Sequence, residues 1–205
     1  MRVISGSAKG RRLKLVPGDS TRPIMDRAKE NLFNILGQFV RGSRWLDLFA
    51  GTGQVGIEAL SRGATAVVFT DKVRPAITTI QQNLKATRLA DKATVLQTDA
   101  FAYLKRPFRQ APPFRQAPPL RQAQRATAQG APFDVIYIAP PQYLGLWVTA
   151  LQAVDRHPTL LTADGIAIAQ IDPKEYEPVA LQNLTLYDQR KYGNTMFCFY
   201  ERVEG

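Results

Sequence analysis

The stretch DLFAGTGQVG, residues 47–56, holds an acidic residue and three glycines between a predicted strand and a predicted helix. Gly51, Gly53 and Gly56 match the spacing G-x-G-x-x-G, and Asp71 follows 20 residues after Gly51. Such a loop lets the backbone approach a bound nucleotide closely, and an acidic residue at that distance can bind ribose hydroxyls. The spacing therefore predicts a nucleotide cofactor site.

The position of Asp47 distinguishes between two cofactors. We expect Asp47 at the end of the strand before the glycines, where its carboxylate would lie near the ligand. A dinucleotide would place a doubly charged pyrophosphate there, and like charges repel strongly in a partly dry site. S-adenosylmethionine instead carries an ammonium and a sulfonium, which a carboxylate attracts. The sequence therefore favours S-adenosylmethionine over a nicotinamide dinucleotide.

A third acidic residue, Asp99, ends another predicted strand at the same edge of the sheet. Its carboxylate could accept the adenine amino group, with the Ala100 amide close to the ring. Asp99 could also cap the following helix, and the two roles are compatible. The predicted donor-binding residues are Asp47, Phe49, Gly51, Gly53, Asp71, Lys72, Asp99 and Ala100.

The stretch VIYIAPPQY, residues 135–143, leads an apolar strand into two prolines, which fix the chain beside the predicted pocket. Methyl transfer to an exocyclic amine needs a positioned nucleophile and an acceptor for the amine's hydrogen bond. Carbonyls around the prolines could provide that acceptor, and an aromatic ring could stack a flipped base. A plain turn after the strand is the alternative. The predicted catalytic residues are Ala139, Pro140, Pro141, Gln142 and Tyr143.

Alternating strands and helices are expected to position these motifs. Helical patterns run over residues 54–62 and from Pro75 onward, and Gly193 and Asn194 form a turn signal between the last two strands. This order predicts an α/β fold, a Rossmann-like doubly wound sheet of about seven strands with an antiparallel last strand. The predicted strands are residues 45–49, 66–70, 93–98, 133–138, 165–171, 183–192 and 195–201.

Two basic segments flank or interrupt this pattern. Residues 1–24 are predicted to form a basic β-hairpin extension, with strands Arg2–Ile4 and Leu13–Val16 around Gly6 and Gly10. Residues 25–205 form the predicted methyltransferase domain. It contains a Pro/Arg/Gln repeat insert at 107–132, which is expected to be disordered because it has few residues able to build a core.

The charge distribution predicts a polyanionic partner. The net charge is +10, and residues 1–30 hold eight Lys/Arg against three acidic residues, while residues 101–132 hold six Lys/Arg and no acidic residue. The rest of the chain is near neutral, as expected for a protein that meets nucleic acid through its extremities. Arg109, Arg115, Arg121 and Arg125 in the insert form a loose tether or belong to a tolerated insertion. The predicted RNA-binding residues are Lys9, Arg11, Arg12, Lys14, Arg22 and Arg27.

Composition excludes several other classes. One cysteine, Cys198, and one histidine, His157, cannot build a Cys/His metal site, so we predict no metal. The chain has no apolar run long enough to cross a membrane and no secretory signal at its start, so we expect no membrane partner. A reduced, cytoplasmic and monomeric protein is the expectation.

The sequence resembles the bacterial RNA guanine-N2 methyltransferases that modify small-subunit (16S) ribosomal RNA. The similarity covers nearly the whole length apart from the insert. It is carried by RVISGSAKGRRL, TRPIMDRAKENLFNIL, DLFAGTGQVGIEALSRGA, DVIYI followed by PP, and YGNTMFCFYE. The glycine loop alone would indicate a class I methyltransferase, whereas the N-terminal RP with the DRAKENLFNIL helix is far more specific.

The resemblance implies the fold of class I methyltransferases, S-adenosylmethionine as methyl donor, and a guanine 2-amino group in small-subunit ribosomal RNA as acceptor. It also implies that Asp47, Gly51 and Gly53 line the methionine part, Asp71 the ribose, and Asp99 with Ala100 the adenine. The family's catalytic motif is Asp-Pro-Pro followed by an aromatic residue. Here Ala139 stands at the acidic position and Gln142 at the aromatic one, with Tyr143 one place later.

Three functions stay open at this point. The first is an RNA guanine methyltransferase that works with an altered acceptor, because the Pro140 carbonyl remains and the donor residues are present. The second is methylation of another exocyclic amine, such as adenine or cytosine, in DNA or RNA. The third is a non-catalytic RNA-binding or ribosome-assembly protein, which only the Ala139 departure supports.

Overall fold

The structure is a computed structural model, and it describes residues 1–18, 24–105 and 131–203. Arg22 and nearly all of the predicted insert at 107–132, including its four arginines, lie outside the described residues.

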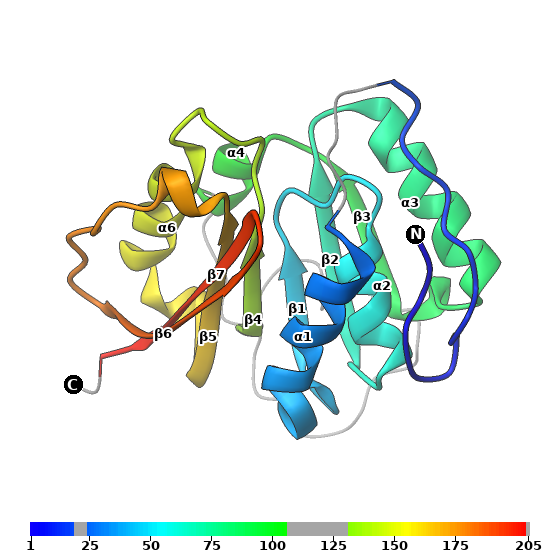
Figure 1. Ribbon diagram of the computed structural model, residues 1–205, viewed down its shortest axis with the longest axis horizontal. Helices are drawn as coiled ribbons and strands as arrows, with labels where there is room; N and C mark the ends of the chain where they lie inside the picture. Colours follow the sequence, from blue (N-terminus) through cyan, green and yellow to red (C-terminus); the bar gives the residue numbers. More distant parts are fainter. Residues whose placement is uncertain (19–23, 106–130, 204–205) are drawn as a thin grey trace.

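A mixed seven-stranded sheet runs through the protein in the order β3-β2-β1-β4-β5-β7-β6 (Figure 1). The first five strands pair in parallel, whereas β7 pairs antiparallel with both β5 and β6. This confirms the predicted doubly wound sheet with a reversed last strand. The strands are β1 (Arg44–Asp47), β2 (Ala66–Asp71), β3 (Ala93–Gln97), β4 (Phe133–Ile138), β5 (Leu161–Ile171), β6 (Leu184–Tyr192) and β7 (Thr195–Arg202).

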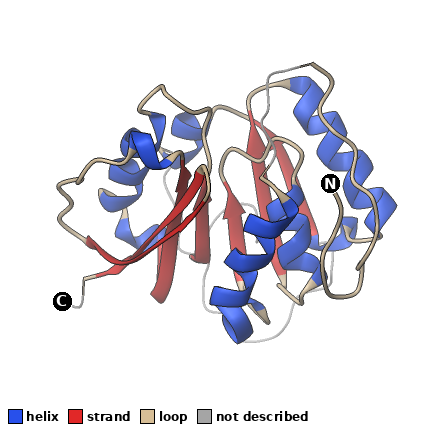
Figure 2. Cartoon of the chain, viewed as in Figure 1, coloured by secondary structure: helices blue, strands red, loops and turns tan. Residues whose placement is uncertain are grey.

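Helices cover both faces of the sheet (Figure 2). The α-helices are α1 (Asp26–Leu36), α2 (Gln54–Ser61), α3 (Arg74–Thr87), α4 (Ala100–Leu104) and α6 (Leu146–Asp155). Short 3-10 helices are η1 (Gly37–Val40), η2 (Ala90–Lys92), η3 (Pro158–Leu160) and η4 (Pro173–Glu175).

Alternation along the central strands builds two separate cores. Trp45 and Val135 pack with α1, α2 and α3 on one face, while Leu46 and Ile136 pack with α4 and α6 on the other. Successive side chains of a strand point to opposite faces, so apolar strands such as these must be covered on both sides. The helices leave the carboxyl ends of the parallel strands uncovered, and the loops that follow these strands lie together at that edge of the sheet.

The N-terminal arm, defined as residues 1–18, folds back on itself, with residues 1–3 facing residues 10–13. It contains a single antiparallel bridge, between Arg2 and Arg12, and no strand. Val3 N donates to Arg11 O at 3.0 Å and Gly10 N to Val3 O at 2.9 Å, while other backbone donors of the arm bond to α2. Ile4 N and Ser5 N donate to the Glu58 carboxylate at 2.7 and 2.9 Å. The arm is therefore held as a loop against the body of the protein.

Further along, the N-terminal arm lies against α3 (Figure 1). The Asn83 side chain accepts from Lys14 N at 2.7 Å and donates to Lys14 O at 3.1 Å. It also donates to Thr52 O at 3.0 Å, in the loop between β1 and α2. Because Asn83 is buried, it joins the arm to the glycine loop through a fixed set of hydrogen bonds.

The sheet ends at β6, which has β7 as its neighbour and carries mostly exposed side chains. Cys198 is buried on β7, as the sequence predicts, and burial raises the pKa of its thiol to about 11. Within the described ranges, no helix combines the length and apolar character needed to cross a membrane.

Candidate active site

A pocket of about 670 Å³ opens where the five parallel strands end. Asp71 and Asp47 close β2 and β1, Asp99 follows β3, Ala139 follows β4, and Gln170 lies near the end of β5. The order of the strands in space therefore sets the order of these residues along the pocket. From β1 the strands proceed to β2 and β3 on one side and to β4 and β5 on the other, and sheets of this kind bind ligands at the point where the strand order reverses.

Asp47 lies at the base of the pocket with 2% of its surface exposed. Its Oδ2 accepts a hydrogen bond from Gly56 N at 3.1 Å, at the start of α2. Burial raises the pKa of Asp47 to about 7, and nearby Asp71 contributes to the rise, whereas the Gly56 hydrogen bond lowers it. A cation in the pocket would favour the ionised carboxylate and bring this pKa down.

Asp71 holds the glycine loop as well as facing the pocket. Its Oδ2 accepts from Gly51 N at 2.9 Å, and its Oδ1 accepts from Val73 N at 3.0 Å. These bonds fix the loop before α2 and the turn before α3. The ribose-binding role predicted for Asp71 stays a prediction, while this loop-holding role is seen directly.

Asp99 caps α4, as the sequence also indicates. Its Oδ1 accepts from Phe101 N and Ala102 N, each at 3.0 Å. Asp99 and Ala100 line the pocket, together with Phe49 and Lys72 of the predicted donor set. The ring of Phe49 meets that of Phe101 edge to face, with centroids 6.2 Å apart, so this end of the pocket has an aromatic wall.

Gly53 is the one predicted donor residue outside the pocket lining. It precedes α2 with a φ of 74°, a conformation that glycine adopts without strain. Gly56 has a packing role, because a Cβ there would lie 2.3 Å from the ring of Phe69 on β2. These glycines let α2 approach the sheet closely, with its N-terminal end beside the pocket.

Tyr143 differs in position from the other four predicted catalytic residues. Ala139, Pro140, Pro141 and Gln142 line the pocket, but Tyr143 does not. The Tyr143 hydroxyl donates to Asp172 Oδ2 at 2.8 Å, and its backbone N–H donates to Glu175. Tyr143 has a φ of 62°, which is uncommon for a residue with a side chain. In this structure Tyr143 holds the loop to η4 instead of offering a ring to the pocket.

Sequence reasoning missed several pocket residues. Tyr137 on β4 and Gln170 on β5 both line the pocket, and the Tyr137 hydroxyl donates to Gln170 Oε1. Gln170 stands out in the sequence as the single polar residue of the apolar run GIAIAQI, a signal that could have identified it. Ile24 and Leu144 add apolar surface.

Gln54 provides a test of whether the pocket suits a cationic methyl donor. Its Oε1 is buried and has no hydrogen-bond partner among the described residues, although Gln54 lines the pocket at the first position of α2. A buried acceptor without a donor is costly unless a ligand supplies one. With Asp47 it forms a pair of acceptors suited to an ammonium group, so the residues present fit S-adenosylmethionine.

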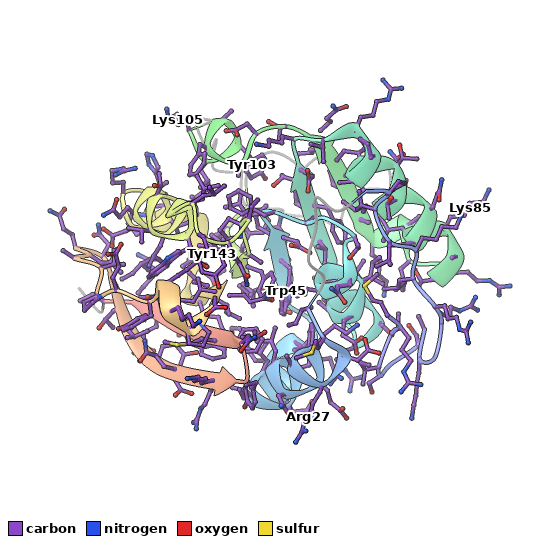
Figure 3. All side chains as sticks on the ribbon, turned by 45° about the horizontal axis from the view of Figure 1, so that its top comes forward. Arg27, Trp45, Lys85, Tyr103, Lys105 and Tyr143 are labelled. Carbon is purple, nitrogen blue, oxygen red and sulfur yellow. The ribbon has the colours of Figure 1, made fainter. Side chains whose placement is uncertain are left out.

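The predicted RNA-binding residues within the described ranges are exposed. Arg11 donates to Ala86 O at 2.8 Å, and Lys14 Nζ donates to Gln82 Oε1 at 3.0 Å, so both extend along α3. Arg27 lies separately on α1 and projects outward (Figure 3). Lys9 and Arg12 complete the exposed set, while Arg22 lies outside the described residues. Among the described side chains, no group of three or more His, Cys, Asp or Glu residues could hold a metal ion.

Comparison with known proteins identifies the class. The fold is that of class I methyltransferases, with the solved structure "Putative methyltransferase yhhF from Escherichia coli" as one neighbour. That structure superposes with a TM-score of 0.77 at 26% identity and covers 98% of this chain and 97% of its own. S-adenosylmethionine is the methyl donor of this class.

The family follows from sequence. The model of the family described as "Conserved hypothetical protein 95" matches residues 1–121 and 115–201, and the chain belongs to this family. The Bacillus subtilis protein "Putative rRNA methyltransferase YlbH" is 38% identical over 98% of this chain and 99% of its own length. "Ribosomal RNA small subunit methyltransferase D" of Haemophilus influenzae is 27% identical over 98% of this chain and 93% of its own.

Proposed function

We propose that this protein transfers a methyl group from S-adenosylmethionine to the exocyclic 2-amino group of a guanine in small-subunit ribosomal RNA. The observation that carries the proposal is the single pocket that combines Asp47, Asp71 and Asp99 with the Ala139–Gln142 segment. The names of the relatives support ribosomal RNA as the substrate. We further propose that the protein acts in the cytoplasm as a monomer.

Three carboxylates form the donor half of the pocket. Asp47 and the Gln54 carbonyl accept from the ammonium of the methionine part, Asp71 from the ribose hydroxyls, and Asp99 from the adenine amino group. Because Asp47 is buried, its attraction for a cation is stronger than it would be in water.

The half of the pocket that would receive the target base is formed by residues that follow β4 and by β5. Pro140 and Pro141 have fixed φ angles, so the backbone carbonyls of this turn keep one direction while a base enters. When bound, the donor supplies an electrophilic methyl carbon, to which the amine nitrogen forms a bond as the C–S electron pair returns to sulfur. The methylated nitrogen then loses a proton to solvent water. The residues of the chain act chiefly by orienting the amine and limiting its access to water.

The N-terminal arm provides the phosphate contacts. Lys9, Arg11, Arg12 and Lys14 lie exposed on a loop that hydrogen bonds fix to α2 and α3. Cations held on a rigid loop can contact successive phosphates without the cost of ordering the loop on binding.

The test is incubation with small ribosomal subunits that lack the modification, and separately with naked small-subunit RNA, using a methyl-labelled donor. We expect N2-methylguanosine after digestion to nucleosides and mass spectrometry. Label in methylated adenine or cytosine would replace guanine with the second candidate acceptor. Donor binding without label in any RNA would leave a non-catalytic, RNA-binding role.

A further inference from the structure

The acidic position of the catalytic motif is held by Ala139, which offers only a methyl group to the pocket wall. Alanine has no side-chain acceptor for an amine hydrogen bond. A polar pair nevertheless lies in the same wall. Tyr137 and Gln170 both line the pocket, and the Tyr137 hydroxyl donates to Gln170 Oε1.

The register of β4 and β5 explains why this pair lies beside Ala139. Tyr137 is opposite Ile168, and Ile138 is opposite Ala169, so the next residues along the two parallel strands are Ala139 and Gln170. Gln170 also pairs with Phe197 on the other side of β5. Tyr137 and Ala139 pack with the same core, on the face that includes Ile168, and Gln170 follows Ile168 by two positions along β5. Alternation therefore places Gln170 on that face too.

The chemistry of the pair leaves an acceptor available. Gln170 Oε1 has two lone pairs, of which the Tyr137 hydroxyl takes one. Burial, reinforced by the charge of Asp47, raises the pKa of Tyr137 well above its ordinary value, so the phenol stays a hydrogen-bond donor. Within the described residues, the two side chains bond to each other and to no further group. The second lone pair of Oε1 can therefore take a hydrogen bond from a ligand.

We propose that Gln170 accepts the hydrogen bond of the target amino group in place of the acid absent at position 139, and that Tyr137 positions the Gln170 carboxamide. The proposal rests on the proposed function and names the acceptor for that same reaction. Gln170 does not take the proton itself, because an amide oxygen is a very weak base. It orients the nitrogen lone pair toward the methyl carbon, and the proton leaves afterwards to solvent water.

The experiment compares four variants of the full chain in the RNA methylation assay. Gln170→Met keeps the length of the side chain but removes the acceptor, and Tyr137→Phe removes only the hydroxyl. Gln189→Met, on the exposed face of β6, is the matched control. The double variant Ala139→Asp/Gln170→Met has no acceptor at position 170 but gains a carboxylate at position 139, on the neighbouring strand, which can accept the hydrogen bond of the amine. Donor affinity is measured by calorimetry and folding by thermal unfolding for every variant.

We expect Gln170→Met to lower kcat about 10- to 100-fold and Tyr137→Phe to lower it by about three- to tenfold. Donor Kd and the KM for RNA should change by less than about threefold, because the lost contact acts mainly in the reacting complex. The double variant should recover kcat to within about threefold of the native chain, which a purely structural role of Gln170 would not allow.

The experiment distinguishes failure of the role proposed for Gln170 from failure of the proposed function. If the native chain labels RNA and Gln170→Met does so at the native rate, the role of the pair is overturned while the proposed function stands. An equal loss in Gln170→Met and in the double variant, with normal unfolding temperatures, would also overturn it. If the native chain labels no RNA at all, the proposed function itself fails.

Discussion

Lys29 Nζ lies 3.7 Å from the carboxylate of Glu58, and neither side chain is exposed to solvent. Lys29 also donates to Arg2 O at 2.6 Å, while Glu58 accepts from the backbone of Ile4 and Ser5. Burial lowers the pKa of Lys29, against the charge of Glu58, which raises it. This pair therefore joins three parts of the protein, the N-terminal arm, α1 and α2.

Removing the cation should destabilise the protein. Lys29→Met removes one of the two cations beside the buried Glu58 carboxylate, and Arg62 Nε stays 2.8 Å from it, so the loss should lie below the value of about 3–5 kcal/mol for a fully broken buried pair. Lys85→Met is the control, since Lys85 is exposed on α3 and points outward (Figure 3), and such surface changes stay within about 0.5 kcal/mol. Urea unfolding measures both. Equal free energies of unfolding for the two variants would contradict this account of the pair.

Gly6 should be required for docking of the N-terminal arm. A Cβ at Gly6 would lie 1.8 Å from Ser61 O on α2, whereas a Cβ at Gly10 would meet nothing within 4 Å. Both glycines have φ near 80°, so alanine at either position carries a similar backbone strain of about 1 kcal/mol. We expect trypsin to cleave after Arg11 and Arg12 much faster in Gly6→Ala than in Gly10→Ala. Similar cleavage rates would mean that the arm is not held at Ser61.

Donor binding should depend on pH through Asp47. The pKa of Asp47 is raised to about 7 in the free protein, and a bound cation lowers it, so the donor prefers the ionised form. As pH falls below 7 the affinity should weaken by up to about tenfold per unit, because protonation of Asp47 competes with binding of the donor. At pH 7, calorimetry in buffers of different ionisation enthalpy should detect release of about half a proton.

Asp47→Asn tests whether the charge of Asp47 is responsible for donor affinity and for its pH dependence. The variant keeps the shape but loses the charge, so donor affinity at pH 8 should fall about 10- to 100-fold. The proton release and the pH dependence below 7 should disappear together. A pH dependence that survives in Asp47→Asn would assign it to another group.

The N-terminal arm should contribute salt-dependent RNA affinity. Arg12→Ala removes one exposed cation from the arm, and loss of one phosphate contact should reduce the slope of log K against log salt by about one unit. Arg156→Ala removes an exposed arginine at the end of α6, on the other face of the sheet, and should leave the slope unchanged. An unchanged slope in Arg12→Ala, measured by filter binding, would remove Arg12 from the predicted set.

The placement of Asp47, Asp71 and Asp99 around one pocket could be predicted because its signals are local. Asp47, Asp71 and Asp99 each follow an apolar strand pattern, and parallel strands bring their carboxyl ends to one edge. Its polarity marks Gln170 within an apolar run, but its place beside Ala139 depends on the register of two strands that are far apart in the sequence.

The N-terminal arm shows a different limit of sequence reasoning. Its pattern predicts a strand over Arg2–Ile4, but the backbone donors of Ile4 and Ser5 bond to Glu58, more than 50 residues away in the sequence. A local pattern carries no information on such a partner. The sequence likewise predicts Tyr143 beside the pocket, but its hydrogen bonds to Asp172 and Glu175 keep it out of the pocket lining.

The strand β6 at the end of the sheet has a consequence for behaviour at high concentration. An outermost strand offers unpaired backbone groups to any other chain, and long apolar ones promote aggregation. Here the strand carries Asp188, Arg190 and Lys191, and Asp188 and Arg190 form an ion pair 2.9 Å long. A second molecule adding a strand there would have to strip water from these charges, so this side of the protein resists fibril-like stacking.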